Sequence, residues 1–406
     1  MAKILVVGGS LGGLFVGNLL HCAGHEVHIL EKVLGSLDGR GAGIVTHPSL
    51  MQALSLVGIT LDDNIGVPVQ GRVTLDAKGD TIAQMHLPQV LTSWSRLYHL
   101  LKEKFPASRY HGGKALHRLE QDTAHVTAYC EDGTQFTGDL LIASDGLRSA
   151  VRAILCPKAM PEYAGYVAWR GVCDEHLLSQ HTLNTLFEYF SFGLPEGEQI
   201  LGYPVAGLNN NITPGNRRYN FVWYHQAPAN NALRDLLTDA DGNYFPQGIA
   251  PVKVSYKHIA HIRERARKTL APQWAEVLEK TGMVFFQPIY DVYSEKIAFE
   301  KIALMGDASF VARPHVGMGV SKAAEDAMSL CNHIEQLGAS PEAILAYQND
   351  RLRIGQRVIA RAQYLGQYMS AQGQEELKKD LQGIAKRVMA ETAVDITTLL
   401  QSQNPI

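Results

Sequence analysis

Three acidic residues stand directly after apolar segments that are typical of short strands. Glu31 ends EVHILE, Asp145 follows DLLIAS, and Asp307 follows KIALMG. In α/β proteins, the crevice outside the carboxyl ends of parallel strands binds nucleotide ligands. A carboxylate at such a place accepts hydrogen bonds from the hydroxyl groups of a ribose or a polyol chain. The three acids therefore predict a site for an extended ligand that is rich in hydroxyl groups.

The N-terminus predicts the structural unit that positions the first of these acids. The apolar run 3–9 is typical of a strand that is buried on both faces of a parallel sheet. A helix is expected over 11–23, with Gly24 as its stop, and a second strand over 26–32. These segments together form a βαβ unit.

The turn inside this unit predicts how a phosphate is held. Gly8, Ser10 and Gly13 occupy the three small-residue positions of the dinucleotide fingerprint, with serine in the middle position. The free N–H groups and the dipole of the following helix favour a pyrophosphate there, to which the Ser10 hydroxyl can donate. Glu31 would accept hydrogen bonds from an adenosine ribose and disfavours a 2′-phosphate, so FAD or NAD is expected. The alternative is an ordinary strand-to-helix turn without a ligand.

The middle of the chain differs in pattern from the N-terminal unit. Residues 160–290 contain aromatic and β-branched runs such as YVAWRGV and YNFVWYHQ, which predict a second, mainly antiparallel sheet. Residues 301–335 return to strand, loop and helix, and 341–390 are helical by period. The acid at 307 thus precedes a glycine-rich loop and a helix far from the N-terminal unit.

Three motifs in this order resemble the single-component FAD-dependent aromatic hydroxylases, most closely the 2,6-dihydroxypyridine 3-hydroxylase branch. The first is the N-terminal glycine turn, the second is Asp-Gly-x-x-Ser-x-x-Arg, and the third is Gly-Asp-Ala followed by Pro-x-x-Gly-x-Gly. The residues of the last two motifs are Asp145, Gly146, Ser149, Arg152, Gly306, Asp307, Ala308, Pro314, Gly317 and Gly319. A flavin dinucleotide is longer than NAD, so a remote acid for its ribityl hydroxyls is expected.

The resemblance implies an α/β, three-layer Rossmann-like FAD-binding fold with an interleaved, mainly antiparallel substrate sheet and C-terminal helices. The implied FAD-binding domain is discontinuous, with residues 1–70, 95–160 and 285–365, beside a substrate domain of residues 71–94 and 161–284 and a helical segment 366–406. Asp307 would bind the ribityl chain, and the loop after Pro314 would face the isoalloxazine, where a helix N-terminus holds negative charge. The implied FAD contacts are Gly8, Ser10, Leu11, Gly13, Glu31, Lys32, Arg40, Val45, Asp145, Gly146, Asp307, Pro314, Gly317, Met318 and Gly319.

The family chemistry that this implies is hydroxylation of an electron-rich hydroxylated aromatic ring, with a hydroxypyridine-type heterocycle as the first candidate. NADH or NADPH reduces tightly bound FAD as a transient co-substrate, and O₂ adds to the flavin to form a C4a-hydroperoxide. A histidine with a pKa near neutrality suits removal of the substrate's hydroxyl proton. The candidates are His315, His47 and His225, although a structural role is the commoner reading for each of the 16 histidines.

Aromatic residues of the second sheet are candidates for the substrate pocket. Tyr203, Tyr224 and Trp169 could line a pocket for a flat ring, and core packing is the alternative. Gln287 lies before the glycine-rich loop, and Arg313 within it; Arg170 and Arg313 could pair with an anionic substrate.

The sequence departs from the family in two places. Phe310 stands where a histidine commonly follows the Gly-Asp pair. Trp94 stands where many members have an arginine that opens a helix, and Arg96 comes two residues later. An arginine contact to the pyrophosphate is therefore not predicted at that helix.

Composition limits the partners and the cellular location that can be expected for the protein. A net charge of −3 indicates no nucleic-acid partner. The sequence contains no run of about 18 apolar residues, so no membrane span is predicted. The five cysteines are scattered, so neither a metal site nor disulfides are predicted, and a cytoplasmic protein is expected. A homodimer is expected from the family resemblance.

Other functions stay open at this point. A phenol or benzoate hydroxylase, a flavin reductase or a halogenase uses the same scaffold, although the W-x-W-x-I-P stretch of halogenases is absent. A dinucleotide-binding module without catalysis is the non-enzymatic alternative.

Overall fold

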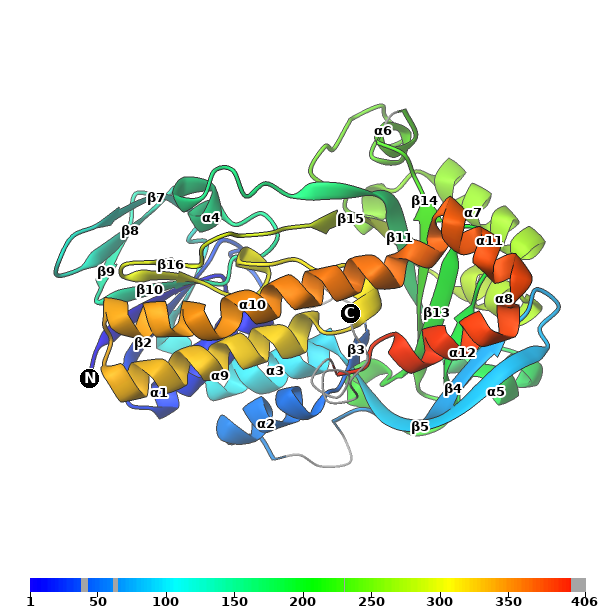
Figure 1. Cartoon of the computed structure of the whole chain (residues 1–406), viewed down its shortest axis with the longest axis horizontal. Coiled ribbons are helices and arrows are strands. Elements are labelled where there is room, and N and C mark those ends of the chain that lie inside the picture. The colour runs from blue at the N-terminus through cyan, green and yellow to red at the C-terminus, as the bar shows by residue number, and fades with distance from the viewer. Residues whose placement is uncertain (38–42, 61–64, 230, 396–406) are drawn as a thin grey trace.

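Two large sheets lie side by side in the computed structural model, and long helices run along both of them (Figure 1). The structure describes residues 1–37, 43–60, 65–229 and 231–395. Arg40, a predicted FAD contact, lies outside the described residues.

The first sheet has six strands in the order β16-β17-β10-β1-β2-β6. All neighbouring pairs are parallel except β16 and β17 at the edge. The apolar sequence of β1 suits its central, buried position, as predicted. The strands are β1 (Lys3–Val7), β2 (Glu26–Glu31), β6 (Tyr110–Gly112), β10 (Leu140–Ala143), β16 (Ala298–Phe299) and β17 (Ile302–Leu304).

Successive residues of β1 point to two different layers. A Cβ added at Gly13 of the first helix would lie 3.4 Å from Val6, and one added at Gly138 would lie 3.0 Å from Leu5. The six-stranded sheet is therefore covered by helices on one face and by a small sheet on the other. The small sheet consists of β7 (Leu116–Gln121), β8 (Val126–Cys130) and β9 (Gln135–Gly138).

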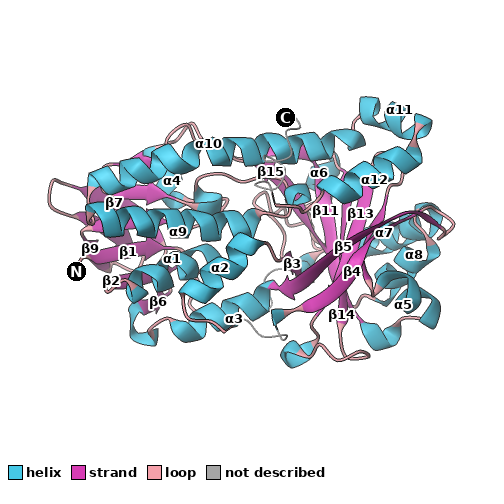
Figure 2. Ribbon diagram, turned by 60° about the horizontal axis from the view of Figure 1, so that its bottom comes forward, coloured by secondary structure: helices cyan, strands magenta, loops and turns pink. Residues whose placement is uncertain are grey.

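Helices α1, α9 and α10 lie together along the first sheet, and α2 and α3 lie beside them (Figures 1 and 2). Side-chain caps begin several helices: Ser93 accepts the N–H of Arg96 in α3, and Ser340 accepts the N–H of Ala343 in α10. The helices of this half are α1 (Leu11–Cys22), α2 (Pro48–Leu56), α3 (Trp94–Lys104), α4 (Ala150–Leu155), α9 (Gly319–Leu337) and α10 (Pro341–Gly366).

The second sheet has eight strands in the order β15-β11-β14-β13-β12-β4-β5-β3, mostly antiparallel, as predicted. One of its faces packs Trp169 and Trp223 against α7 (Tyr256–Thr269) and α8 (Pro272–Lys280), and α8 contributes Trp274 to this contact. The strands are β3 (Gly43–Val45), β4 (Val67–Leu75), β5 (Thr81–Ser93), β11 (Glu162–Asp174), β12 (Tyr189–Gly193), β13 (Gln199–Val205), β14 (Arg218–Gln226) and β15 (Phe285–Asp291).

Short helices complete the second half of the molecule (Figure 2). They are α5 (Gln180–Leu186), α6 (Asn231–Leu236), α7 (Tyr256–Thr269), α8 (Pro272–Lys280), α11 (Ala371–Lys379) and α12 (Leu381–Glu391). Among the described residues, no helix is both long and apolar enough to span a bilayer.

The α/β fold class with an interleaved second sheet is confirmed. Two stretches that the sequence analysis assigned to the FAD-binding segments, β3 and β15, pair into the second sheet instead. The remaining domain boundaries stay a prediction.

Candidate active site

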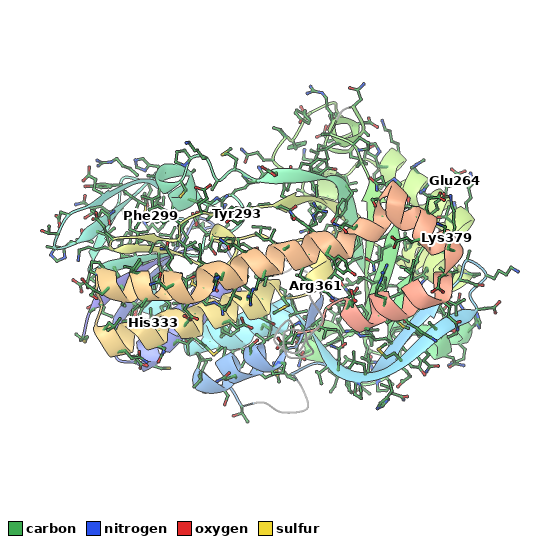
Figure 3. The ribbon with its side chains drawn as sticks, viewed as in Figure 1. Glu264, Tyr293, Phe299, His333, Arg361 and Lys379 are labelled. Carbon is green, nitrogen blue, oxygen red and sulfur yellow. The ribbon has the colours of Figure 1, made fainter. Side chains whose placement is uncertain are left out.

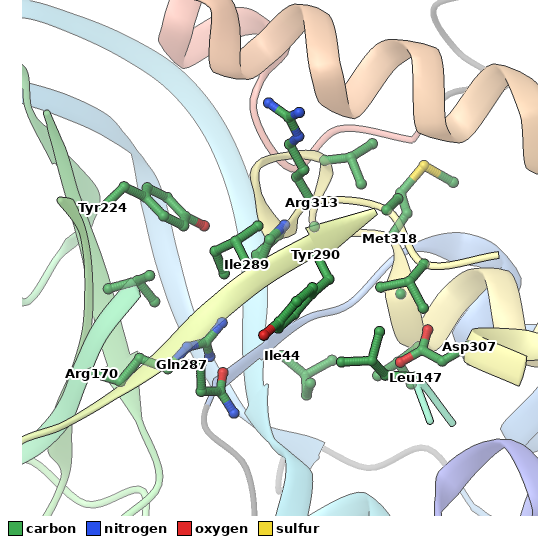
Figure 4. A pocket seen from close by; sticks show the side chains of 18 of the residues that line it. Ile44, Leu147, Arg170, Tyr224, Gln287, Ile289, Tyr290, Asp307, Arg313 and Met318 are labelled. Carbon is green, nitrogen blue, oxygen red and sulfur yellow. The ribbon is translucent and has the colours of Figure 1, made fainter. Parts of the chain in front are cut away.

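Two cavities share a lining residue, Arg148. The smaller one, of about 430 Å³, lies at the carboxyl ends of β1, β2 and β10. The larger one, of about 600 Å³, lies between the second sheet and the loop from Arg313 to Gly319 (Figure 4). A long ligand can thus extend from one sheet to the other.

Tight backbone packing forms the turn at the smaller cavity. Gly8 has a φ of +102°, and a Cβ there would lie 2.3 Å from the carbonyl oxygen of Ser144. A Cβ at Gly13 would lie 1.8 Å from the carbonyl oxygen of Gly8. Both positions therefore require glycine, as the fingerprint predicts.

Most of the predicted nucleotide contacts line this cavity, namely Gly8, Ser10, Glu31, Lys32, Asp145 and Gly146. Leu11 is buried at the start of α1 and is not among the lining residues. The Glu31 carboxylate accepts the N–H groups of Gly9 over 2.8 Å and of Val33 over 2.9 Å. These bonds fix the acid at the end of β2, beside the glycine turn.

Asp145 also has a structural role at the start of α4. Its Oδ2 accepts the N–H of Ala150 over 2.7 Å at the start of α4. Burial raises the pKa of Asp145, and the hydrogen bonds it accepts oppose that rise. The residue also lines the smaller cavity, so capping and ligand contact are compatible.

Asp307 lies in a turn that buried side chains hold from three directions. Lys322 of α9 donates to the carbonyl of Gly306 over 3.0 Å, and the Asp326 carboxylate accepts the N–H of Gly306 over 2.9 Å. Arg152 donates to the carbonyl of Ala308 over 2.9 Å. Asp307 itself is exposed to the larger cavity, and no described residue hydrogen-bonds its carboxylate.

Arg152 therefore joins two of the sequence motifs. It belongs to Asp-Gly-x-x-Ser-x-x-Arg and contacts the main chain of Gly-Asp-Ala. Ser149 caps α4 by accepting the N–H of Arg152 over 2.9 Å, which fixes the position of the arginine.

The glycine-rich loop forms the wall of the larger cavity. Pro314, Gly317, Met318 and Gly319 line it, and α9 begins at Gly319, so the N-terminus of this helix faces the cavity. Gly317 has a φ of +64°, and its carbonyl oxygen lies 3.2 Å from Nε2 of His47. The positive helix end can stabilise a negative charge there.

The second sheet forms the other wall of the larger cavity. Tyr203, Tyr224 and Gln287 line it, as predicted, and so do Val45 and Arg170. Arg313 also lines it, but its guanidinium is paired with Asp291, with Nη2 2.9 Å from Oδ2.

Trp169, a predicted substrate contact, is not among the residues that line this cavity. It lies between Ala168 and Arg170 on β11, and successive residues of a strand point to opposite faces. Trp169 packs against Phe286 in the core beneath α8, with ring centroids 5.0 Å apart.

Comparison with known proteins identifies the family. A family model described as FAD binding domain matches residues 1–190 and 253–362, and a second, described as FAD binding domain-like, matches 163–291. The chain belongs to the FAD-binding domain family.

Relatives within this family extend over nearly the whole chain. The 2,6-dihydroxypyridine 3-monooxygenase of Paenarthrobacter nicotinovorans is 31% identical to it over 329 residues, covering 81% of each protein. The solved structure of 2,6-dihydroxypyridine-3-hydroxylase from Arthrobacter nicotinovorans is similar with a TM-score of 0.86 at 28% identity, covering 91% of this chain and 92% of that one. These comparisons confirm the resemblance read from the three motifs.

HpxO of Klebsiella pneumoniae, solved in complex with FAD and uric acid, has the same fold. The TM-score is 0.78 at 22% identity, and the match covers 96% of this chain and 93% of that one. The matching family model describes an FAD-binding domain, so FAD is the cofactor of this family, as predicted.

The residues of the two cavities fit FAD. The glycine turn at Gly8 and Gly13 leaves the helix N-terminus open to a pyrophosphate, and Glu31 lies beside it. The carboxylate of Asp307 faces the larger cavity and has no hydrogen-bond partner in the described part of the chain, so it is free to accept from a polyol. The roles of the individual contacts stay predictions.

The three candidate histidines do not line the larger cavity. His315 is buried, with Nδ1 2.9 Å from Oε1 of Gln199 and Nε2 3.0 Å from the hydroxyl of Tyr166. With the amide oxygen of Gln199 as acceptor, Nδ1 donates and Nε2 accepts the tyrosine hydroxyl. Burial lowers the pKa of His315 to about 3, and Arg313 adds to this effect.

His47 and His225 occupy other structural positions. His47 is buried beside the carbonyl of Gly317, and burial lowers its pKa. Nδ1 of His225 lies 2.6 Å from the carboxylate of Glu198, which also pairs with Arg265 of α7. His225 is thus on the helix-covered face of the second sheet. A catalytic role for any of the three stays a prediction that this geometry does not favour.

Several lining residues were not predicted from the sequence. Trp94, Lys114 and Glu131 line the smaller cavity, and Trp94 stacks on Tyr98 with centroids 4.8 Å apart. Trp94 thus occupies the place at which the family resemblance suggested an arginine. Arg148 was recognisable only as an unassigned residue inside the second motif.

The C-terminal segment also reaches the larger cavity, since Thr392 and Ala393 line it. Arg72 is fully buried and donates to the carbonyls of Met389, Thr392 and Ala393 at the end of α12. The N–H of Ala393 donates to the carbonyl of His315 over 3.2 Å.

A second anchor joins this segment to α10. Arg361 lies on α10 beside α12, and its Nη2 is 3.1 Å from the Glu391 carboxylate (Figure 3). Within the described part of the chain, no cluster of three or more histidines, cysteines or acids is placed to hold a metal ion.

Proposed function

We propose that the protein is an FAD-dependent monooxygenase that hydroxylates an electron-rich, hydroxylated aromatic ring, with a hydroxypyridine-type heterocycle as the first candidate. The observation that carries the proposal is the pair of neighbouring cavities that are both lined by Arg148. A single extended cofactor can place its adenosine end in one cavity and its ring in the other. The relative named for 2,6-dihydroxypyridine supports the choice of ring.

FAD, when bound, takes up two electrons from NADH or NADPH and activates O₂ for transfer of one oxygen atom to the ring. The chain supplies binding and orientation. Asp307 would accept hydrogen bonds from the ribityl hydroxyls, and the N-terminus of α9 would face the ring, where it favours negative charge. Glu31 would hold the ribose at the other end.

The walls of the larger cavity orient a flat aromatic substrate. Tyr203 and Tyr224 extend from β13 and β14, and apolar contacts come from residues such as Ile289 and Leu201. Burial raises the pKa of both tyrosines, so their hydroxyls stay protonated at neutral pH and can donate hydrogen bonds. Such a pocket excludes water from most of the ring surface.

The experiment that tests the proposal measures NADH and NADPH oxidation by the holoenzyme with panels of hydroxypyridines, hydroxynicotinates and phenols. We expect at least one hydroxylated N-heterocycle to stimulate oxidation and to yield an oxygenated product. A response to phenols or benzoates alone would contradict the choice of ring. Reduction of a double bond without incorporation of oxygen would contradict the monooxygenase.

The flavin content of the purified protein tests the non-catalytic alternative. A colourless protein that cannot be reconstituted with FAD would contradict the proposal at its first step. If aromatic substrates did not change the rate of oxygen consumption, the proposed hydroxylation would be contradicted.

A further inference from the structure

The wall of the larger cavity carries more positive than negative side chains. Its lining cations are Arg148, Arg170 and Arg313, whereas Asp307 is the only acid among the described lining residues. Arg313 is neutralised by Asp291. Figure 4 shows Asp307 and Arg170 at opposite ends of the cavity, so Asp307 does not offset the charge of Arg170.

Arg170 lies on the cavity face of the second sheet. In the antiparallel register it is paired with Val222 on β14 and with Phe285 on β15. Val222 in turn is paired with Leu201 on β13, so Tyr224 and Tyr203 stand in the rows on either side of Arg170. Their hydroxyl-bearing rings and the guanidinium thus share one surface.

Electrostatics agree with this register. Burial raises the pKa of Tyr203 and of Tyr224, and in both cases the positive charge of Arg170 opposes the rise. Arg170 is therefore near enough to both phenols to act on their hydroxyl groups.

The guanidinium of Arg170 has no partner among the described residues. Its Nε is buried without a hydrogen bond, and no described acid forms an ion pair with it. A guanidinium offers five donors in a planar fork, and leaving one of them buried and unpaired, as Nε is here, is costly. Oxyanions with two coplanar oxygens match this fork.

We propose that Arg170 binds an anionic group of the aromatic substrate, either a carboxylate or an ionised ring hydroxyl, and thereby selects substrates that carry a negative charge. The proposal rests on the proposed function, because it assigns the substrate class of the same cavity. Arg170 holds the ring by its charged edge, and Tyr203 and Tyr224 can donate to the same oxyanion. A ring bound through an ionised hydroxyl is already electron-rich, so for such a substrate this cavity needs no histidine base.

The test uses the FAD-loaded enzyme and matched probes of one shape and two charges. The pairs are benzoate with benzamide and 6-hydroxynicotinate with 6-hydroxynicotinamide, and binding is read from the change in flavin absorbance. We expect the wild type to bind the anionic member about tenfold tighter or more, as for one charge-assisted hydrogen-bond pair. Arg170→Met should abolish this preference, and Arg170→Lys should restore part of it.

Ring oxyanions need a separate arm of the test. Affinity for 2,6-dihydroxypyridine should rise with pH as its hydroxyl ionises, and Arg170→Met should remove that dependence. Loss of either preference, carboxylate or ring oxyanion, supports the proposal and identifies which group binds. Arg218→Met is the matched control, because Arg218 is on β14 but pairs with Asp174 away from the cavity.

Unchanged charge preference in Arg170→Met with normal FAD content would overturn the proposal, and so would equal binding of both pair members by the wild type. Failure of the proposed function looks different. In that case the wild type would show no ring-stimulated NADH oxidation, whatever its binding preference for anions.

Discussion

The ammonium group of Lys322 donates a hydrogen bond of 3.0 Å to the carbonyl oxygen of Gly306, the residue before Asp307. The same nitrogen lies 3.0 Å from the Asp326 carboxylate, which accepts the N–H of Gly306. Both main-chain polar groups of the turn are thus bound by side chains of α9. The helix whose N-terminus faces the larger cavity therefore also positions the acid expected to bind the flavin chain.

Asp307→Ala should weaken FAD binding by roughly tenfold to a hundredfold, because it removes the acceptor of charge-assisted hydrogen bonds worth about 1.5–3 kcal/mol. The FAD affinity of Asp307→Asn should lie between those of the wild type and Asp307→Ala, since an amide oxygen still accepts hydrogen bonds. Flavin-to-protein absorbance after gel filtration and titration of apoprotein with FAD measure the effect. Asp174→Ala, at the surface pair with Arg218, is the control. Near-wild-type FAD affinity in Asp307→Ala would refute the ribityl role.

Asp326→Asn should lower the free energy of unfolding by about 3–5 kcal/mol, because it removes the counter-ion of buried Lys322 and leaves Arg351 with Glu325 alone. Urea unfolding of the apoprotein gives the number. Asp350→Asn serves as the control, since Asp350 is exposed and contacts Ser329 of the neighbouring helix, and its loss should cost under about 1 kcal/mol. Equal stability of the two variants would show that the buried cluster contributes no more than a surface contact.

The contribution of Asp326 to stability should depend on pH in a defined direction. Burial by itself would raise the pKa of Asp326, but Lys322 and Arg351 outweigh it and lower the pKa. A lowered pKa in the folded state means that the contribution to stability is complete above the unfolded value of about 3.9 and is lost as the pH falls below it. Asp326→Asn should therefore be less acid-sensitive than the wild type below about pH 4.

His315→Gln should flatten the pH dependence of stability in a different window. The folded pKa of about 3 lies below the unfolded value of about 6.5, so the neutral ring stabilises the fold fully above pH 6.5 and progressively less toward pH 3. The wild type should lose up to about 1.4 kcal/mol per pH unit more than the variant within that window. Parallel stability curves would show that His315 does not stay neutral in the fold.

The same variant addresses catalysis. If His315 is only structural, His315→Gln should keep the pH profile of kcat while stability changes. A selective loss of hydroxylation with increased peroxide release would instead return His315 to the role of base.

Arg72→Met should loosen the C-terminal segment from the cavity wall. Burial lowers the pKa of Arg72 to about 9, so the residue stays charged at neutral pH and binds the carbonyls that end α12. We expect faster proteolysis after α10 and more peroxide per NADH oxidised, because water would enter where Thr392 and Ala393 line the cavity. Arg118→Met, at an exposed pair with Glu120, is the control. Unchanged peroxide release would mean that the segment does not seal the site.

The sequence by itself determined the parts that depend on neighbours in the chain. The strand, glycine turn and helix of the N-terminal unit follow from local pattern, and Gly13 is required by its contact with Gly8 in the same turn. The contact that requires glycine at position 8 is instead with Ser144, far along the chain. The end-of-strand positions of Glu31, Asp145 and Asp307 follow from local pattern as well. Their order along the chain was sufficient to indicate the family and FAD.

Tertiary structure alone decided which side chains reach the substrate end. On β14, Trp223 and His225 point to the helices and Tyr224 to the cavity, yet both faces are buried and aromatic, so the alternation carries no signal in the sequence. The same alternation along β11 places Arg170 on the cavity face and Trp169 on the helix-covered face. The joining of Lys322 and Asp326 to Gly306, and of Arg72 to Ala393, depends on contacts between elements far apart in the chain, and residue spacing contains no information about such contacts.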